Sequence, residues 1–359
     1  MGKRVVVVGA GIIGASFALH LARTGADVKL VDAMHSIGGV ATSCSWAWLN
    51  ASWGNTEPYF RLRHHAMSLW RDLDKAVPGL SVQWSGGLLW DLPEGDLRAF
   101  AAQHKGWGYD VRLVDAAEVV RLEPHIAKPP VLAAHVKEEG AVEPVHAVEK
   151  LLAAAQAAGA DLLRGVRVTR LTENGGKVTG VMTNDGALEA DDVVLAVGTE
   201  INTLLEPLGQ HLDIDAPAGL LVHSEPMAEL LNGLIMSPRL HVRQTANGAL
   251  VAGSDFGGTD PGVDADKAAA ELFAELQGFL VGGENLKFSH ATLGYRPTPK
   301  DGVSAIGRVA GLDGLYICCT HSGITLAPAL GALGSQDILT GETADLLKPF
   351  NPYRLMRKP

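Results

Sequence analysis

The chain has 359 residues and a formal net charge of −10. This charge, with no run of Lys or Arg, argues against a general nucleic-acid-binding protein, which needs a basic surface to displace counterions from phosphates. With 47% hydrophobic residues, 19% charged residues and 42 glycines, the composition excludes a disordered or fibrous chain and favours an α/β enzyme of about two domains.

Cysteine content and apolar runs suggest a location in the cell. Cys44, Cys318 and Cys319 are too few for a disulfide framework, and no Cys/His spacing resembles a metal site, so we expect a reducing, cytoplasmic compartment and no metal. The apolar run at residues 5–8 is too short for a signal peptide. No segment reaches the ~18 apolar residues of a membrane span. Composition leaves peripheral membrane attachment open.

The first predicted elements form a strand, turn, helix and strand. Residues 4–8 predict a buried strand, residues 9–25 a glycine-rich turn that enters a helix, and residues 28–31 a second strand that ends at Asp32. The parallel strands of such a unit need a crossover, which is right-handed by default.

The turn carries the motif G-x-G-x-x-G at residues 9–14. Gly9 allows the tight turn, Gly11 lets the backbone approach a pyrophosphate, and Gly14 permits close helix–strand packing, while the helix N-terminus supplies N–H donors. Asp32 is placed to accept hydrogen bonds from a ribose and disfavours NADP, because a carboxylate repels a 2′-phosphate. The motif predicts a dinucleotide site, but does not separate FAD from NAD. Cofactor contacts are predicted here for Gly9, Gly11, Ile12, Ile13, Gly14, Asp32 and Ala33.

The middle of the chain predicts an insertion followed by a return to the first domain. Residues 61–73 have helical periodicity, and residues 81–135 contain short strand-like pieces broken by prolines, which indicates a separate β-rich unit. A helix at 145–158 and an apolar strand at 193–197 then belong again to the first domain.

The last third alternates in the same way. Residues 211–255 predict strands, with a hairpin turn at Asn247-Gly248, and residues 265–280 a helix. A strand at 315–319 leads through a polar turn into a helix at 324–339. We therefore predict two discontinuous domains: a dinucleotide-binding domain from residues 1–80, 139–210 and 285–359, and a substrate-binding domain from residues 81–138 and 211–284.

Several further motifs, in order, resemble the FAD-dependent D-amino-acid oxidase superfamily from residue 4 to about residue 341. The most specific are the last two. The matching segments are G-G-V-A-T-S at 38–43, R-L-E-P at 121–124, G-A-V-E-P at 140–144, G-V-R-V at 165–168, A-V-G at 196–198, G-Y-R-P-T-P-K-D-G at 294–302 and T-H-S-G-I-T-L-A-P at 320–328. The resemblance implies FAD as cofactor. It also implies an α/β fold in which a Rossmann-like FAD-binding domain joins a discontinuous α+β substrate domain built on an antiparallel sheet.

The turn at 320–323 has a physical interpretation of its own. The helix that follows this turn would present a second N-terminus able to stabilise an anion, which a nicotinamide dehydrogenase does not need. The alternative is an ordinary connection between a strand and a helix. In a flavoenzyme it would face the N1–C2=O edge of the flavin. By the resemblance, further cofactor contacts are Thr42, Ser43, Ala47, Trp48, Leu49, Val166, Ala196, Gly198, Thr320, His321, Ser322, Gly323, Ile324 and Thr325. The sarcosine-oxidase branch attaches its flavin to a cysteine where this chain has Gly294, so we expect non-covalent FAD.

Arg296 matches the family position that binds the substrate carboxylate, which a guanidinium can hold bidentately. The alternative for Arg296 is a structural salt bridge. His241 is a candidate for contacting substrate or taking the amine proton, or is a histidine satisfied by structural hydrogen bonds. Arg243, Trp48 and Thr320 are further substrate-binding candidates. Adjacent Cys318 and Cys319 are interpreted as small buried apolar residues.

The predicted function is oxidation of the C–N bond of a primary or secondary amino acid to an imine, by hydride transfer to flavin N5. The electrons would pass to O2 or to a quinone or electron-transfer partner. Two alternatives stay open: an NAD-dependent dehydrogenase, and a non-catalytic or electron-transferring FAD subunit of a hetero-oligomeric amine dehydrogenase. The side chain, stereochemistry and N-substitution of the substrate are open, as is a homo- or hetero-oligomeric state.

Overall fold

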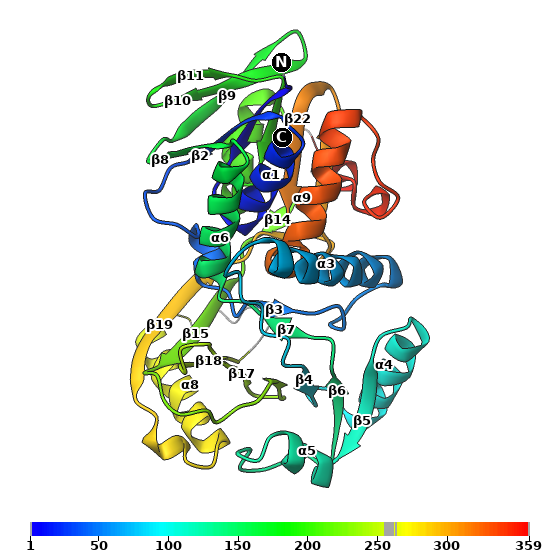
Figure 1. Ribbon diagram of the computed structural model, residues 1–359, viewed down its shortest axis with the longest axis vertical. Coiled ribbons are helices and arrows are strands. Elements are labelled where there is room, and N and C mark those ends of the chain that lie inside the picture. Colours follow the sequence, from blue (N-terminus) through cyan, green and yellow to red (C-terminus); the bar gives the residue numbers. More distant parts are fainter. Residues whose placement is uncertain (1, 255–261, 263, 358–359) are drawn as a thin grey trace.

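Two large β-sheets lie at opposite ends of the molecule, and helix α3 (Glu57–Ala76) crosses between them (Figure 1). The structure, a computed structural model, describes residues 2–254, 262 and 264–357. No helix within these ranges is long and apolar enough to cross a membrane.

The first sheet has nine strands, and its centre is parallel: β1 pairs with β2 on one side and with β12 on the other. The strands of this centre are buried on both faces, which explains why they are continuous apolar runs such as residues 5–8. The strands are β1 (Arg4–Val8), β2 (Asp27–Asp32), β8 (Asp161–Arg164), β9 (Val168–Asn174), β10 (Lys177–Thr183), β11 (Gly186–Glu189), β12 (Asp192–Leu195), β21 (Ala305–Val309) and β22 (Leu312–Cys319).

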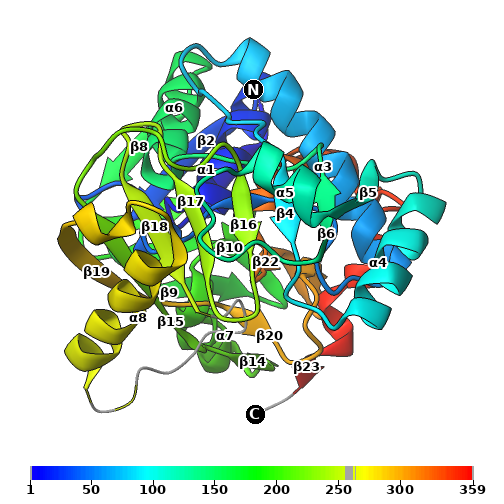
Figure 2. The same ribbon diagram turned by 90° about the horizontal axis from the view of Figure 1, so that it is seen from below.

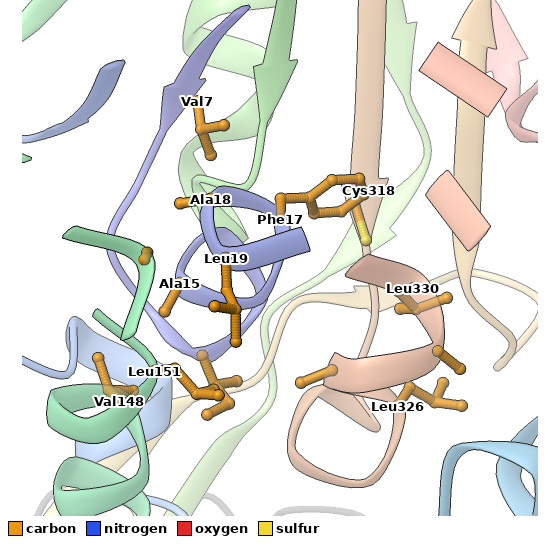
Figure 3. Packing of buried hydrophobic residues seen from close by; sticks show 14 of the residues in the cluster. Val7, Ala15, Phe17, Ala18, Leu19, Val148, Leu151, Cys318, Leu326 and Leu330 are labelled. Atoms are coloured by element: carbon orange, nitrogen blue, oxygen red, sulfur yellow. The ribbon is translucent and has the colours of Figure 1, made fainter. Parts of the chain in front are cut away.

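Helices α1 (Ile12–Arg23), α6 (Pro144–Ala157) and α9 (Gly323–Thr340) pack together against this sheet (Figures 1 and 3). Their core contains Phe17, whose ring packs edge to face against that of Tyr316, with 5.9 Å between the ring centroids. Cys318 lies in the same core, as the sequence predicted for a small buried apolar residue.

Glycine permits the close contact between α9 and α1. A Cβ at Gly331 would lie 2.3 Å from the Ser16 hydroxyl oxygen and 2.9 Å from the Ser16 carbonyl carbon. The Ser16 hydroxyl donates a hydrogen bond to the carbonyl oxygen of Ala327 at 2.7 Å. The two helices are therefore held in one relative position by contacts that no larger residue than glycine allows at this point.

The second sheet has eight strands and is antiparallel except for the parallel pair β4 and β16 (Figure 2). The predicted hairpin at Asn247-Gly248 is confirmed, because β17 and β18 pair on either side of it. The strands are β4 (Gly87–Leu89), β5 (Val111–Asp115), β6 (Leu132–Val136), β15 (Ala218–Ser224), β16 (Leu234–Met236), β17 (His241–Gln244), β18 (Leu250–Gly253) and β19 (Phe288–Tyr295). The helices packed near it are α4 (Glu94–Gly106), α5 (Ala116–Leu122) and α8 (Ala265–Phe279).

The second sheet extends past the boundary predicted at residue 285. Strand β19 pairs with β15 along its whole length, so the chain returns to the first sheet only after residue 295. Short elements complete the fold: α2 (Val40–Ser43), α7 (Ile201–Leu205), β3 (Trp48–Leu49) with β7 (Gly140–Ala141), β13 (His211–Leu212) with β23 (Met356–Arg357), and β14 (Ile214–Asp215) with β20 (Thr298–Pro299). Single 3-10 turns lie at Gly198–Glu200, Glu206–Leu208, Gly283–Asn285, Lys348–Phe350 and Pro352–Arg354.

The α1–α9 contact predicts how two glycines differ. Gly331→Ala should lower the free energy of unfolding by about 1–3 kcal/mol, because its methyl group forces the helices apart. Gly278→Ala in α8 is the matched control: nothing lies within 4 Å of its Cβ position, so alanine should stabilise that helix by about 0.5–1 kcal/mol. Urea unfolding measures both, and equal effects at the two positions would contradict the packing constraint.

Candidate active site

A cavity of about 1000 Å³ runs between the two sheets. One end is the glycine turn after β1, and the other lies against β15, β17 and β18 of the second sheet. This volume lies at the upper end of small-molecule pockets, which suits an extended ligand with a small second molecule beside it.

The glycine turn has the geometry that the motif requires. Gly9 has φ of +99°, and a Cβ at Gly14 would lie 1.7 Å from the Gly9 carbonyl oxygen. The first-turn N–H of Ile12 donates to the Thr42 hydroxyl at 3.3 Å. The chain therefore brings α1 to the cavity with its N-terminus first, as a pyrophosphate-binding turn does.

The carboxylate of Asp32 has a structural task besides the ribose contact predicted from the sequence. It accepts hydrogen bonds from the backbone N–H of Ala10 at 2.6 Å and of Met34 at 2.7 Å. Asp32 also lines the cavity. It therefore holds the glycine turn in place at the edge of the cavity.

The N-terminus of α9 faces the same cavity. The Ser322 side chain does not cap the helix, so the N–H groups of the first turn stay available to a ligand. The ring Nε2 of His321 donates to the Gly302 carbonyl oxygen at 2.7 Å. Burial, and then the positive charge of Arg63, lower the pKa of His321 to about 4, so this imidazole is neutral at physiological pH.

Residues 46–50 form the wall between the two helix N-termini. Ala47 has φ of +61°, a left-handed conformation that is uncommon outside glycine. The Thr325 hydroxyl donates to the Trp48 carbonyl oxygen at 2.9 Å, which ties this wall to the first turn of α9. Trp46, Ala47 and Trp48 line the cavity.

A buried carboxylate that sequence analysis missed supports this wall. Glu139 is fully buried and accepts hydrogen bonds from the Trp48 indole at 2.9 Å, the Ser52 hydroxyl at 2.5 Å and the Tyr109 hydroxyl at 3.0 Å. Burial raises the pKa of Glu139 to about 7 despite these three donors. The sequence signal was weak, because a single Glu is usually exposed.

Arg63 on α3 was also missed. Its side chain is buried and lines the cavity, where it donates to the Asn50 carbonyl oxygen at 2.9 Å, the Asn50 side-chain oxygen at 2.6 Å and the Asn55 side-chain oxygen at 3.1 Å. Helical spacing was an available signal, because Tyr59, Arg63 and Trp70 share the buried face of α3.

The far end of the cavity carries the predicted substrate residues Arg296 and His241. Arg296 follows the end of β19, and its backbone N–H donates to the Pro217 carbonyl oxygen at 3.0 Å. A Cβ at Gly219 would lie 3.3 Å from a guanidinium nitrogen of Arg296, so glycine at 219 leaves room for that group. The His241 ring lies 6.2 Å from that of Trp46.

Arg243 lies behind the wall rather than in the cavity. Its Nε donates to the Trp46 carbonyl oxygen at 2.7 Å, and its guanidinium forms an ion pair with Glu143 at 2.8 Å. The structure thus places Arg243 where it supports the Trp46 turn, away from the ligand space in which the sequence predicted a substrate contact.

Most of the predicted cofactor contacts line the cavity, and three do not. Gly14 packs against Gly9, the Ser43 hydroxyl donates to the Gly39 carbonyl oxygen at 2.8 Å, and Leu49 is buried in the core. Those lining the cavity are Gly9, Gly11, Ile12, Ile13, Asp32, Ala33, Thr42, Ala47, Trp48, Val166, Ala196, Gly198, Thr320, His321, Ser322, Gly323, Ile324 and Thr325.

Comparison with known families identifies the group that this cavity holds. Residues 4–336 match the family described as FAD dependent oxidoreductase, or DAO. The chain belongs to the DAO family. This FAD-dependent oxidoreductase is 29% identical over 363 residues to the glycine oxidase of Pseudomonas putida, with 95% of each chain covered. It is also 28% identical over 379 residues to the uncharacterized oxidoreductase YurR of Bacillus subtilis, with 98% of each covered.

Solved structures show the same fold. The crystal structure of L-proline dehydrogenase from P. horikoshii superposes with a TM-score of 0.89 at 22% identity, covering 98% of this chain and 97% of that one. The cofactor of the DAO family is FAD, and the residues of this cavity fit it: an open helix N-terminus for the pyrophosphate, Asp32 for the ribose and a second helix N-terminus at the other end.

The hydrogen bonds of Asp32 to the glycine turn, together with the ribose contact expected from the sequence, predict that its removal lowers the affinity for FAD. Asp32→Ala should raise the Kd for FAD ten- to a hundredfold, since hydrogen bonds to a charged group contribute about 1.5–3 kcal/mol. Flavin absorbance or fluorescence titration of the apoprotein measures this. Asp27→Ala, at the exposed start of the same strand, should leave the Kd within about twofold; an unchanged Kd for Asp32→Ala would contradict the assignment.

The buried Glu139 predicts a pH dependence of stability. Its pKa is about 7 in the folded protein and 4.5 ordinarily, so the stability it contributes is present below about pH 4.5 and is lost as pH rises through 7. Glutamine does not ionise, so Glu139→Gln does not lose this stability as the pH rises. The free energy of unfolding of Glu139→Gln minus that of wild type should therefore increase by about 3 kcal/mol between pH 4.5 and pH 8.

Urea unfolding of the FAD-loaded proteins across this pH range measures the difference. The control is Glu94→Gln, since Glu94 is exposed and pairs with Arg98 on its own helix. A pH-independent difference for Glu139→Gln would show that Glu139 does not titrate in this range.

Proposed function

We propose that this enzyme oxidises the C–N bond of a primary or secondary amino acid to an imine. Arg296 in the cavity wall is the observation that carries the proposal, since a guanidinium beside a cofactor-sized space is suited to binding a carboxylate. The names of relatives support this class of substrate, because glycine oxidase and L-proline dehydrogenase are named for a primary and a secondary amino acid.

Arg296 holds the substrate carboxylate bidentately and so fixes the position of the carbon that bears the amine. When bound, FAD supplies the hydride acceptor, and the protein chiefly provides orientation and electrostatics. His241, on β17 at the same end of the cavity, is the candidate to contact the amine and receive its proton. No nucleophile or metal is needed for this chemistry.

The indoles of Trp46 and Trp48 form a wall that excludes water from the reacting atoms. Trp48 is held by Glu139, and the Trp46 carbonyl oxygen is held by Arg243. Thr320 lies on the opposite side at the α9 turn, where its hydroxyl accepts a hydrogen bond from Ser304 at 2.7 Å. The eight-stranded sheet thus provides the substrate side, and the nine-stranded sheet the FAD side. O2 or a quinone or electron-transfer partner then takes the electrons.

The test is the visible spectrum of the FAD-loaded protein, recorded without oxygen before and after adding D-, L- and N-methyl amino acids. One member of the panel should bleach the flavin band, and readmitted air should restore the colour only if O2 is the acceptor. A flavin band that none of the panel bleaches would overturn the proposal in favour of an FAD subunit of a larger amine dehydrogenase.

Arg296→Met tests the carboxylate contact in the same assay. The substrate concentration for half-maximal bleaching rate should rise at least about 30-fold, since leaving a carboxylate without its charged partner costs about 2–5 kcal/mol. The control Arg98→Met removes an exposed arginine of α4 and should behave as wild type. Unchanged bleaching by Arg296→Met would show that the carboxylate binds elsewhere.

A further inference from the structure

We propose that Arg63 is the buried positive charge that stabilises the reduced form of FAD in this enzyme, acting beside the N-terminus of α9. The proposal rests on FAD binding, and it holds whichever amino acid is the substrate.

The first support is geometric. The Arg63 Nε donates to the Asn50 carbonyl oxygen at 2.9 Å, and the Asn50 backbone N–H donates to the Thr325 hydroxyl at 3.4 Å. Thr325 belongs to the first turn of α9. The guanidinium and the helix N-terminus are therefore joined through one residue, and both line the same cavity.

Arg63 hydrogen-bonds to neutral groups rather than to a carboxylate. In the part of the chain that the structure describes, no Asp or Glu lies within ion-pair distance of Arg63, and its acceptors are amide oxygens of Asn50 and Asn55. Asp301, which also lines the cavity, is paired with Arg354 at 2.5 Å. A buried guanidinium beside the positive end of a helix is unfavourable unless an anion joins them.

Glu139 is a carboxylate that interacts electrostatically with Arg63, but it compensates the positive charge of Arg63 only in part. It raises the pKa of Arg63 through its charge, while burial lowers that pKa more strongly. The oxygens of Glu139 are already bound by Trp48, Ser52 and Tyr109. Burial also raises the pKa of Glu139 to about 7, so this carboxyl group is partly protonated near neutral pH.

The positive potential extends to the α9 turn itself. After burial, the charge of Arg63 is the largest cause that lowers the pKa of His321, and Arg296 contributes to the same lowering. His321 is therefore neutral and adds no positive charge of its own. Arg63 remains the permanently charged group fastened to the first turn of α9.

The chemistry of a flavin supplies the missing anion. Amine oxidation removes two electrons and two protons from the substrate; bound FAD would accept both electrons and one proton, and the other proton would leave to solvent. The added negative charge would lie at the N1–C2=O edge, which the sequence predicts to face the α9 turn. A cation held there favours reduction.

The experiment measures the two-electron reduction potential of FAD-loaded variants by dye equilibration, without substrate. Arg63→Gln should make reduction at least tenfold less favourable, a potential about 30 mV more negative. Arg63→Lys keeps the charge and should stay within about threefold of wild type, roughly 15 mV. Arg61→Gln, which removes an exposed arginine of the same helix, is the matched control and should leave the potential unchanged.

A potential that is unchanged in Arg63→Gln would overturn the proposal. If that variant instead weakened only the binding of a carboxylate inhibitor such as benzoate, Arg63 would be a second carboxylate-binding group, and the proposal would again be wrong. If Arg63→Gln fails to retain FAD, Arg63→Lys is compared with wild type instead. If Arg63→Lys retains FAD but its reduction is more than tenfold less favourable than in wild type, the charge of residue 63 does not have the proposed role. Failure to find an amino-acid substrate would leave these potentials and their interpretation unaffected.

Discussion

The close packing of α9 against α1 determines where the active site lies. Both helices follow strands of one parallel sheet, β1 and β22, which have only β12 between them, so their N-termini meet at the same sheet edge. Gly331 lets the helices approach until Ser16 bonds to Ala327. A dinucleotide that spans this edge would meet a helix N-terminus at each end.

The segment from residue 46 to residue 55 and helix α3 connect this edge to the second sheet (Figure 1). They carry several buried polar groups, and these are satisfied by hydrogen bonds such as that from the Trp48 indole to Glu139, 91 positions away in the chain. Buried polar networks of this kind define a single arrangement, because a half-satisfied network is costly. The cavity wall formed by residues 46–50 is therefore held in one arrangement.

Three arginines show how surroundings decide a role. Arg243 forms an ion pair with Glu143 and donates to the Trp46 carbonyl oxygen, so its charge is compensated within the protein. Arg296 lies at the end of β19 and faces the substrate end of the cavity. Arg63 donates to neutral amide oxygens, and Glu139 compensates its charge only in part. The same type of side chain thus lies in three different electrostatic surroundings.

The sequence by itself determined the features that depend on neighbouring residues. The G-x-G-x-x-G turn, the hairpin at Asn247-Gly248 and helix α9 follow local rules of backbone geometry and apolar spacing, and all are present. The resemblance to flavin enzymes identified the family correctly. Only the tertiary structure decided the placement of β19 in the second sheet, the position of Arg243 behind the wall, and the hydrogen-bond partners of Glu139 and Arg63. These features depend on partners from 13 to 197 positions away in the chain. The residues next to a charged side chain in the sequence do not determine which distant residue it will contact.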